Sequence, residues 1–161
     1  MPAATVRKGL EDPTVKTVVF RDLTREESEQ LLVRNHIGRI AFAFQGKVDV
    51  EPIGYVFSDG ALYARTTPGT KLTVLAHHPW VAFEVDEIRG PFDWESVVVK
   101  GTVYFVELAD TRRSRGAYDH ALAVIQQAMP AAFTAHDPVP HRSVLLRIHV
   151  HEIEGRAAST G

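Results

Sequence analysis

Apolar and polar residues alternate along six short segments of the chain, a pattern typical of strands that are half buried in a sheet. Tight turns at Gln45-Gly46 and Ser58-Asp59-Gly60 join the first three segments, so an antiparallel meander is expected there. The predicted strands cover residues 39–44, 47–57 (with an interruption at Pro52), 61–65, 80–86, 94–106 and 143–153.

Two longer segments have the periodicity of helices. Thr24 and Glu27 form a capping box, which predicts a helix through about residue 35. Residues 111–129 carry one apolar stripe that includes Leu122 and Ile125. Six strands with flanking helices indicate a mainly β protein built as a small closed or split barrel.

Composition limits the class of protein. A chain of 161 residues that is 45% hydrophobic can bury one core, so residues 17–161 are expected to form a single domain behind a flexible leader, residues 1–16. A net charge of −2 argues against nucleic acid as a partner. The absence of cysteine excludes disulfides and thiolate sites. No apolar run approaches the ~20 residues that cross a bilayer, so no membrane partner and a cytoplasmic location are expected.

The stretch from Tyr63 to Lys71 has the composition of a phosphate site. Thr67 can cap a short helix that begins at Pro68, which leaves the amides of residues 69–71 free at the positive end of the helix dipole. Arg65 and Lys71 add positive charge to the same end, which favours a bound anion. The alternative is an ordinary capped turn with solvated basic side chains, and the local sequence does not separate the two.

Pro52 and Gly54 lie inside the second predicted strand. Proline cannot donate to a strand ladder, and glycine has no side chain to pack. This position is therefore either a bulge or a place where a flat group approaches the backbone.

Five segments in this order resemble the pyridoxamine 5′-phosphate oxidase-like family of FMN-binding split-barrel proteins. The resemblance runs from about Leu23 to Phe105 and implies a six-stranded antiparallel split β-barrel of Greek-key type. The matching segments are Gly38–Phe42, Val50–Tyr55, Leu62–Lys71, Val81–Asp86 and Trp94–Gly101.

The resemblance also implies a cofactor site at a homodimer interface. FMN would be held by its phosphate near the start of the short helix and by its ring against the preceding strand, and residues 94–96 would reach it from one of the two chains. The implied cofactor-binding residues are Pro52, Ile53, Gly54, Ala64, Arg65, Thr66, Thr70, Lys71, Trp94, Glu95 and Ser96. No catalytic residue and no metal ligand is assigned.

Two differences from true pyridoxamine phosphate oxidases argue against oxidation of vitamin B6. Arg147-Ile148-His149 lacks the Asp-Arg pair that follows in true pyridoxamine phosphate oxidases, and Gly54 replaces their substrate-binding lysine. The expected function is therefore an FMN-dependent oxidoreductase acting on a small molecule that the sequence does not identify. The alternative is a non-catalytic barrel that holds FMN, deazaflavin F420 or haem for storage, sensing or scavenging.

Overall fold

The computed structural model describes residues 16–108 and 111–161, so the predicted leader lies outside the described residues except for Lys16. The described part contains seven strands and three helices. They are β1 (Val18–Asp22), α1 (Arg25–Arg34), β2 (Ile37–Phe44), β3 (Lys47–Ser58), β4 (Ala61–Thr66), α2 (Thr70–His77), β5 (Trp80–Gly90), β6 (Asp93–Val106), α3 (Arg112–Ala128) and β7 (Val144–Thr160).

Six of the strands close into a ring. Their order is β7-β4-β3-β2-β5-β6, and β6 pairs again with β7, with every pairing antiparallel. This ring confirms the predicted six-stranded antiparallel architecture. The seventh strand, β1, was not predicted; it pairs with the end of β7, which continues to Thr160 instead of stopping at Ile153.

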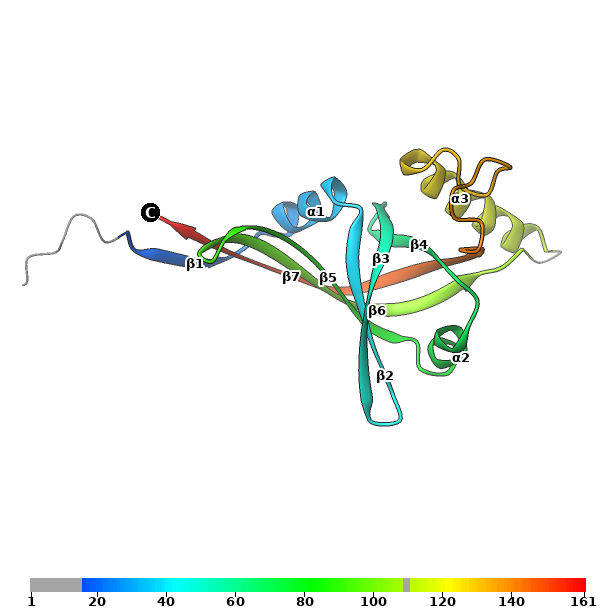
Figure 1. The fold of residues 1–161 in the computed structure, drawn as a ribbon, viewed down its shortest axis with the longest axis horizontal. Coiled ribbons are helices and arrows are strands. Elements are labelled where there is room, and N and C mark those ends of the chain that lie inside the picture. Colours follow the sequence, from blue (N-terminus) through cyan, green and yellow to red (C-terminus); the bar gives the residue numbers. More distant parts are fainter. Residues whose placement is uncertain (1–15, 109–110) are drawn as a thin grey trace, which may run out of the picture.

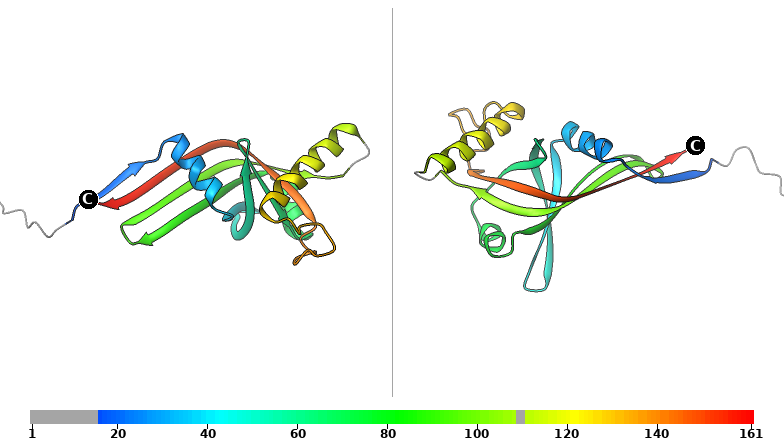
Figure 2. Two further views of the ribbon diagram at one scale, coloured as in Figure 1. Left: turned by 90° about the horizontal axis from the view of Figure 1, so that it is seen from above. Right: turned by 180° about the vertical axis from the view of Figure 1, so that it is seen from behind.

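The ring extends to one side as a long arm, made of β5, β6, the second half of β7, and β1 (Figure 1). Helix α1 lies along the arm, whereas α2 and α3 lie at the opposite end of the molecule (Figures 1 and 2). Leu31 and Leu32 of α1 are fully buried in the main core, together with Phe83 and Val97 of the strands. A second cluster packs α3 against β4 and β7.

The glycines and the proline inside the strands have different effects on strand pairing. Gly101 lies at a register shift between β6 and β7, and a glycine suits this place because a Cβ there would lie 2.2 Å from the carbonyl oxygen of His149. Pro52 and Gly54, in contrast, sit in an unbroken register with Arg39 and Ile37 of β2. The predicted bulge is therefore wrong, and the close approach of a flat group remains as the alternative.

Part of the outer face of the sheet, around Val48, Val50 and Trp80, has no helix packed on it, whereas α3 packs on Val56 of the same face. Strand alternation and register place Val48, Ala43 and Trp80 in one row on the outer face of β3, β2 and β5, and Val50 and Ile37 on the same face. Four of these side chains are largely exposed, with fractions of 57–75% for Val50, Trp80, Ile37 and Val48. Apolar exposure on this scale is typical of a surface that contacts another molecule.

Candidate functional site

The ring is split between β3 and β4. These strands pair only over residues 55–58 and 61–64, after which β3 continues with β2, and Arg65 and Thr66 continue with β7. The gap between β3 residues 47–54 and residues 65–71 is called the notch below. Along the notch, the edge of β3 has no strand partner in the described part of the chain, which leaves backbone donors and acceptors available to a ligand.

The far side of the notch is the start of α2. This helix begins at Thr70 with Gly69 as N-cap and no capping side chain, so the predicted cap at Thr67 and start at Pro68 are wrong. Thr66 is still paired with β7, and a residue that precedes proline favours extended backbone, so the chain enters the helix two residues later. An uncapped N-terminus presents free amides and the positive end of the dipole.

Lys71 crosses the notch. Its ammonium group bonds to the carboxylate of Glu51 on β3, and its side chain is 17% exposed. Together with Thr70 and Asp49, this pair lines a hollow of about 270 Å³. A cation held beside an uncapped helix start is the donor set that a phosphate group requires.

The side chain of Arg65 points away from the start of α2 and towards Asp137. Its guanidinium lies 2.6 Å from the carboxylate of Asp137 and 4.4 Å from the centre of the Phe133 ring, and the side chain is only 5% exposed. Its Nε donates to the carbonyl oxygen of Arg142 at 2.8 Å. The expected crowding of Arg65 and Lys71 at one helix end is therefore not found, because strand alternation turns Arg65 beneath α3.

The residues predicted to lie beneath the cofactor ring differ in which of their atoms a ligand can reach. Ile53 and Ala64 are buried in the core, so only their backbone is available to a ligand. Pro52 is exposed and Gly54 is partly exposed. A Cβ on Gly54 would meet nothing closer than 3.7 Å, so a flat group can approach the backbone there. The residues present thus fit a planar cofactor with a phosphate.

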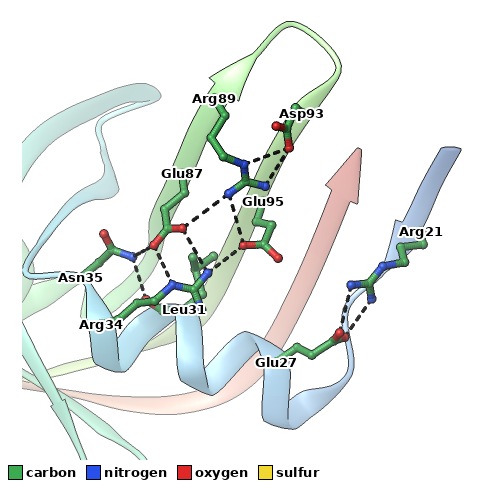
Figure 3. Close-up of polar contacts among 9 residues, drawn as sticks. All are labelled: Arg21, Glu27, Leu31, Arg34, Asn35, Glu87, Arg89, Asp93 and Glu95. Carbon is green, nitrogen blue, oxygen red and sulfur yellow. Dashed lines mark hydrogen bonds and ion pairs between the residues drawn. The ribbon is translucent and has the colours of Figure 1, made fainter. Parts of the chain in front are cut away.

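The stretch Trp94–Ser96 lies on the arm, away from α2 (Figure 1). Glu95 faces α1, where Arg34 approaches its carboxylate at 2.7 Å (Figure 3). Ser96 faces the other side and donates to Glu84 at 3.1 Å. Within one chain the structure does not bring this stretch to the notch.

Sequence reasoning missed the polar network that fixes the arm to α1 (Figure 3). Arg34 donates to Glu87 at 2.7 Å, and Asn35 donates to the same carboxylate. The hydrogen bond from Arg34 holds the pKa of Glu87 below its usual value. These partners are more than fifty residues apart, so no local pattern could have revealed them.

The described residues contain no cluster of three side chains able to hold a metal ion. His149 and His151 lie with ring centres 4.9 Å apart, and His151 contacts the Trp80 ring at 4.8 Å. Nor does any helix in this part of the chain combine the length and apolar character needed to span a bilayer.

Comparison with known proteins defines the family. Residues 24–157 match the model of a pyridoxamine 5′-phosphate oxidase family, so the chain belongs to that family. A crystal structure of an FAD-binding protein from Mesorhizobium loti is similar, with 32% identity and a TM-score of 0.70 over 88% of this chain and 99% of that one.

Two further relatives extend the comparison. An uncharacterized protein of Rhizobium meliloti (strain 1021) is 26% identical over 88% of this chain and 97% of its own length. An FAD-binding protein of Mycobacterium smegmatis shares the fold, with 24% identity and a TM-score of 0.61 over 85% of this chain and 98% of that one. The predicted family and split-barrel fold are thus confirmed.

Proposed function

We propose that this protein binds FMN in the notch and uses it as an oxidoreductase. The observation that carries the proposal is the split between β3 and β4, with an unpaired strand edge on one side and Lys71 beside an uncapped helix on the other. Bound FMN would supply hydride and electron transfer, so the protein needs no nucleophile of its own. The residues of the chain bind and orient the cofactor.

The proposed roles follow from position. Thr70 and Lys71 hold the phosphate, with Thr66 beside them at the end of β4, and the backbone of Pro52–Gly54 lies against the ring. Arg65 contributes through its backbone, since its side chain is occupied by Asp137. The Mesorhizobium loti relative is described as FAD-binding. FAD contains the same ring and ribityl phosphate, so it is the competing cofactor.

We further propose that two chains complete the site. Trp94 and Ser96 lie at the start of β6, away from the notch of their own chain, so they reach the cofactor only if a second chain supplies them. The part of the outer face that carries Val48, Val50 and Trp80 is apolar and exposed. A twofold dimer through this face buries those side chains, which is the usual way in which a soluble protein covers such a surface.

The alternative is a barrel that stores or senses a cofactor without turnover. A hollow of about 200 Å³ beside Gly54 favours the enzyme, because a small substrate could enter there next to the ring. The test is the visible spectrum of the protein loaded with FMN, followed by anaerobic addition of NADPH. An oxidoreductase that accepts this donor loses its flavin absorbance. A bound flavin that neither NADPH nor dithionite reduces would support the storage role. A haem spectrum in the purified protein would show that the cofactor is haem and not a flavin.

A further inference from the structure

The hollow beside Gly54 lies between β3, the C-terminal end of α3 and the segment 131–142, which is called the roof loop below. Its volume is about 200 Å³. The lining is mainly apolar and is contributed by Ile37, Val56, Ile125, Ala128, Met129 and Val139.

The roof loop is fixed by a buried ion pair. Asp137 bonds to Arg65 at 2.6 Å, and the two side chains are 3% and 5% exposed. The same carboxylate accepts the backbone N–H groups of Phe133 at 2.8 Å and Val139 at 3.0 Å. Phe133 has a φ of 61°, which is strained for a bulky residue, so the loop holds one enforced shape.

Two of the four polar side chains of the lining are occupied. The Tyr55 hydroxyl donates to the carbonyl of Leu32 at 2.7 Å, and Arg65 is bound to Asp137 and to loop carbonyls. His36 and Arg142 have no side-chain hydrogen-bond partner among the described residues, and no carboxylate lines the hollow. A ligand here finds an apolar space lined by two exposed residues whose side chains can donate, and by no negative charge, which disfavours a cationic molecule.

We propose that this hollow is the substrate subsite and that it takes a one-ring aromatic molecule carrying a carbonyl-type oxygen. This proposal rests on the proposed function, because it places the ligand next to a ring held against Gly54. An apolar cavity of about 150 Å³ accommodates benzene, so one ring with a short substituent fits a space of this size. A second fused ring exceeds a space of this size, so it would lie outside the hollow unless the roof loop moves, which requires the ion pair of Arg65 and Asp137 to break.

The experiment compares acetophenone with 2-acetonaphthone on the full chain, with and without FMN. Binding is followed by the NMR shifts of the Gly54 and Ala128 amides, and in the loaded protein also by the absorption of the flavin. Acetophenone should bind at least tenfold more tightly than 2-acetonaphthone, about 1.4 kcal/mol. Ethylbenzene, which lacks the oxygen, should bind more weakly than acetophenone to the natural protein. In His36→Ala, Arg142→Ala and their double variant, the two ligands should bind equally weakly.

Matched variants separate the hollow from general effects on the helix. Ala128→Phe places a ring into the hollow and should weaken acetophenone by roughly tenfold or more. Ala123→Phe, on an exposed part of α3 that does not line the hollow, should leave binding unchanged. Asp137→Asn should loosen the roof loop and improve 2-acetonaphthone relative to acetophenone.

Two results would overturn the proposal. One is equal affinity for the two ketones in the natural protein, or an affinity for acetophenone that Ala128→Phe leaves unchanged. The other is binding of acetophenone that leaves the absorption of bound FMN unchanged, since the ligand would then lie away from the ring. Failure of the protein to take up FMN would count against the proposed function, while the amide shifts still report whether the hollow selects by size.

Discussion

Lys71 and Glu51 face each other across the notch, and this pair sets the charge of the site. In the structure the ammonium group is bound to the carboxylate of Glu51, so an incoming phosphate has to replace that partner. Both side chains are partly exposed, which keeps the strength of the pair modest. Glu51 is thus expected to oppose the binding of an anion that Lys71 favours.

Glu51→Gln should therefore strengthen FMN binding. Removal of the carboxylate takes away both the competition for Lys71 and the repulsion of the phosphate, so the Kd for FMN should fall by roughly threefold to tenfold. The Kd for riboflavin, which carries no phosphate, should change little. Fluorescence titration of the flavin measures both constants. A parallel gain for riboflavin would show that Glu51 acts on the ring and not on the phosphate.

Arg65 shows what a sequence can and cannot reveal about one residue. Its place next to Thr66 and Lys71 suggested a phosphate ligand, and the motif did locate the notch. The direction of its side chain depends on Asp137, which lies seventy-two residues away in an irregular loop. The contact therefore had no local signal. The motif marks one side of the notch, and the tertiary contacts decide which of its side chains face it.

At the scale of the elements, α1 is fixed by its capping box. Thr24 accepts from the N–H of Glu27, and the Glu27 carboxylate accepts from the N–H of Thr24, as the sequence predicted. Arg21 of β1 also binds Glu27, at 2.9 Å. The hydrogen bond from Arg21, followed by that from the Thr24 backbone, lowers the pKa of Glu27 from 4.5 to about 2.

The stability contributed by Glu27 should consequently depend on pH. A lowered pKa means that the contribution is complete above pH 4.5 and is lost as the pH falls toward 2. The natural protein should be more stable than Glu27→Gln at neutral pH, and the difference should shrink across this window. Urea unfolding of both proteins from about pH 7 down to about pH 2.5, a range that covers most of this window, measures the difference. A constant gap across this range would contradict the assignment.

The packing of α1 on β7 depends on Gly155. A Cβ at this position would lie 2.3 Å from the hydroxyl of Ser28 and 2.8 Å from Cβ of Leu23. Gly155→Ala should destabilise the protein by about 1–3 kcal/mol, because α1 has to shift. Gly116→Ala is the control: it lies in α3 with nothing within 4 Å of a new Cβ, and it should stabilise by about 0.5–1 kcal/mol.

Thermal and chemical unfolding of both variants provide the measurement. Equal effects for Gly155→Ala and Gly116→Ala would contradict the close packing of α1 against β7.

The six ring strands and the two longer helices followed from hydrophobic pattern and caps. Strand β1 and the end of β7 did not. Four of the five residues of β1 are exposed, and its partner segment Arg156–Thr160 lacks the apolar alternation of a strand. Pairing with β6 and β1 holds that segment extended, an effect of tertiary context that overrides local propensity.

At the scale of the whole molecule, the arm and the apolar outer face suggest assembly. The arm extends well beyond the ring, and α1 lies along it (Figures 1 and 2). No local pattern predicts this shape, because the polar network of Figure 3 joins residues far apart in the chain. The family resemblance, not the pattern, suggested the dimer.

Val50→Lys should weaken the proposed dimer. Val50 is 57% exposed on the outer face, and a lysine there would bring a charge into an apolar contact. Val33→Lys is the matched control, since Val33 is 56% exposed but lies on α1. Light scattering should give a dimer for the natural protein and for Val33→Lys, and a larger monomer fraction for Val50→Lys. A natural protein that is monomeric and still binds FMN tightly would contradict the shared site.

The central claim is that the start of α2 with Lys71 recognises the phosphate of a flavin nucleotide. Its most direct test is a titration of FMN, FAD and riboflavin into the natural protein and Lys71→Ala, each freed of flavin. Charge-assisted hydrogen bonds contribute about 1.5–3 kcal/mol, so the variant should bind FMN roughly tenfold to a hundredfold more weakly. Riboflavin should bind poorly to both proteins, with little difference between them, and the ranking of FMN and FAD identifies the natural cofactor. Equal losses for FMN and riboflavin, or no loss for either, would contradict the account.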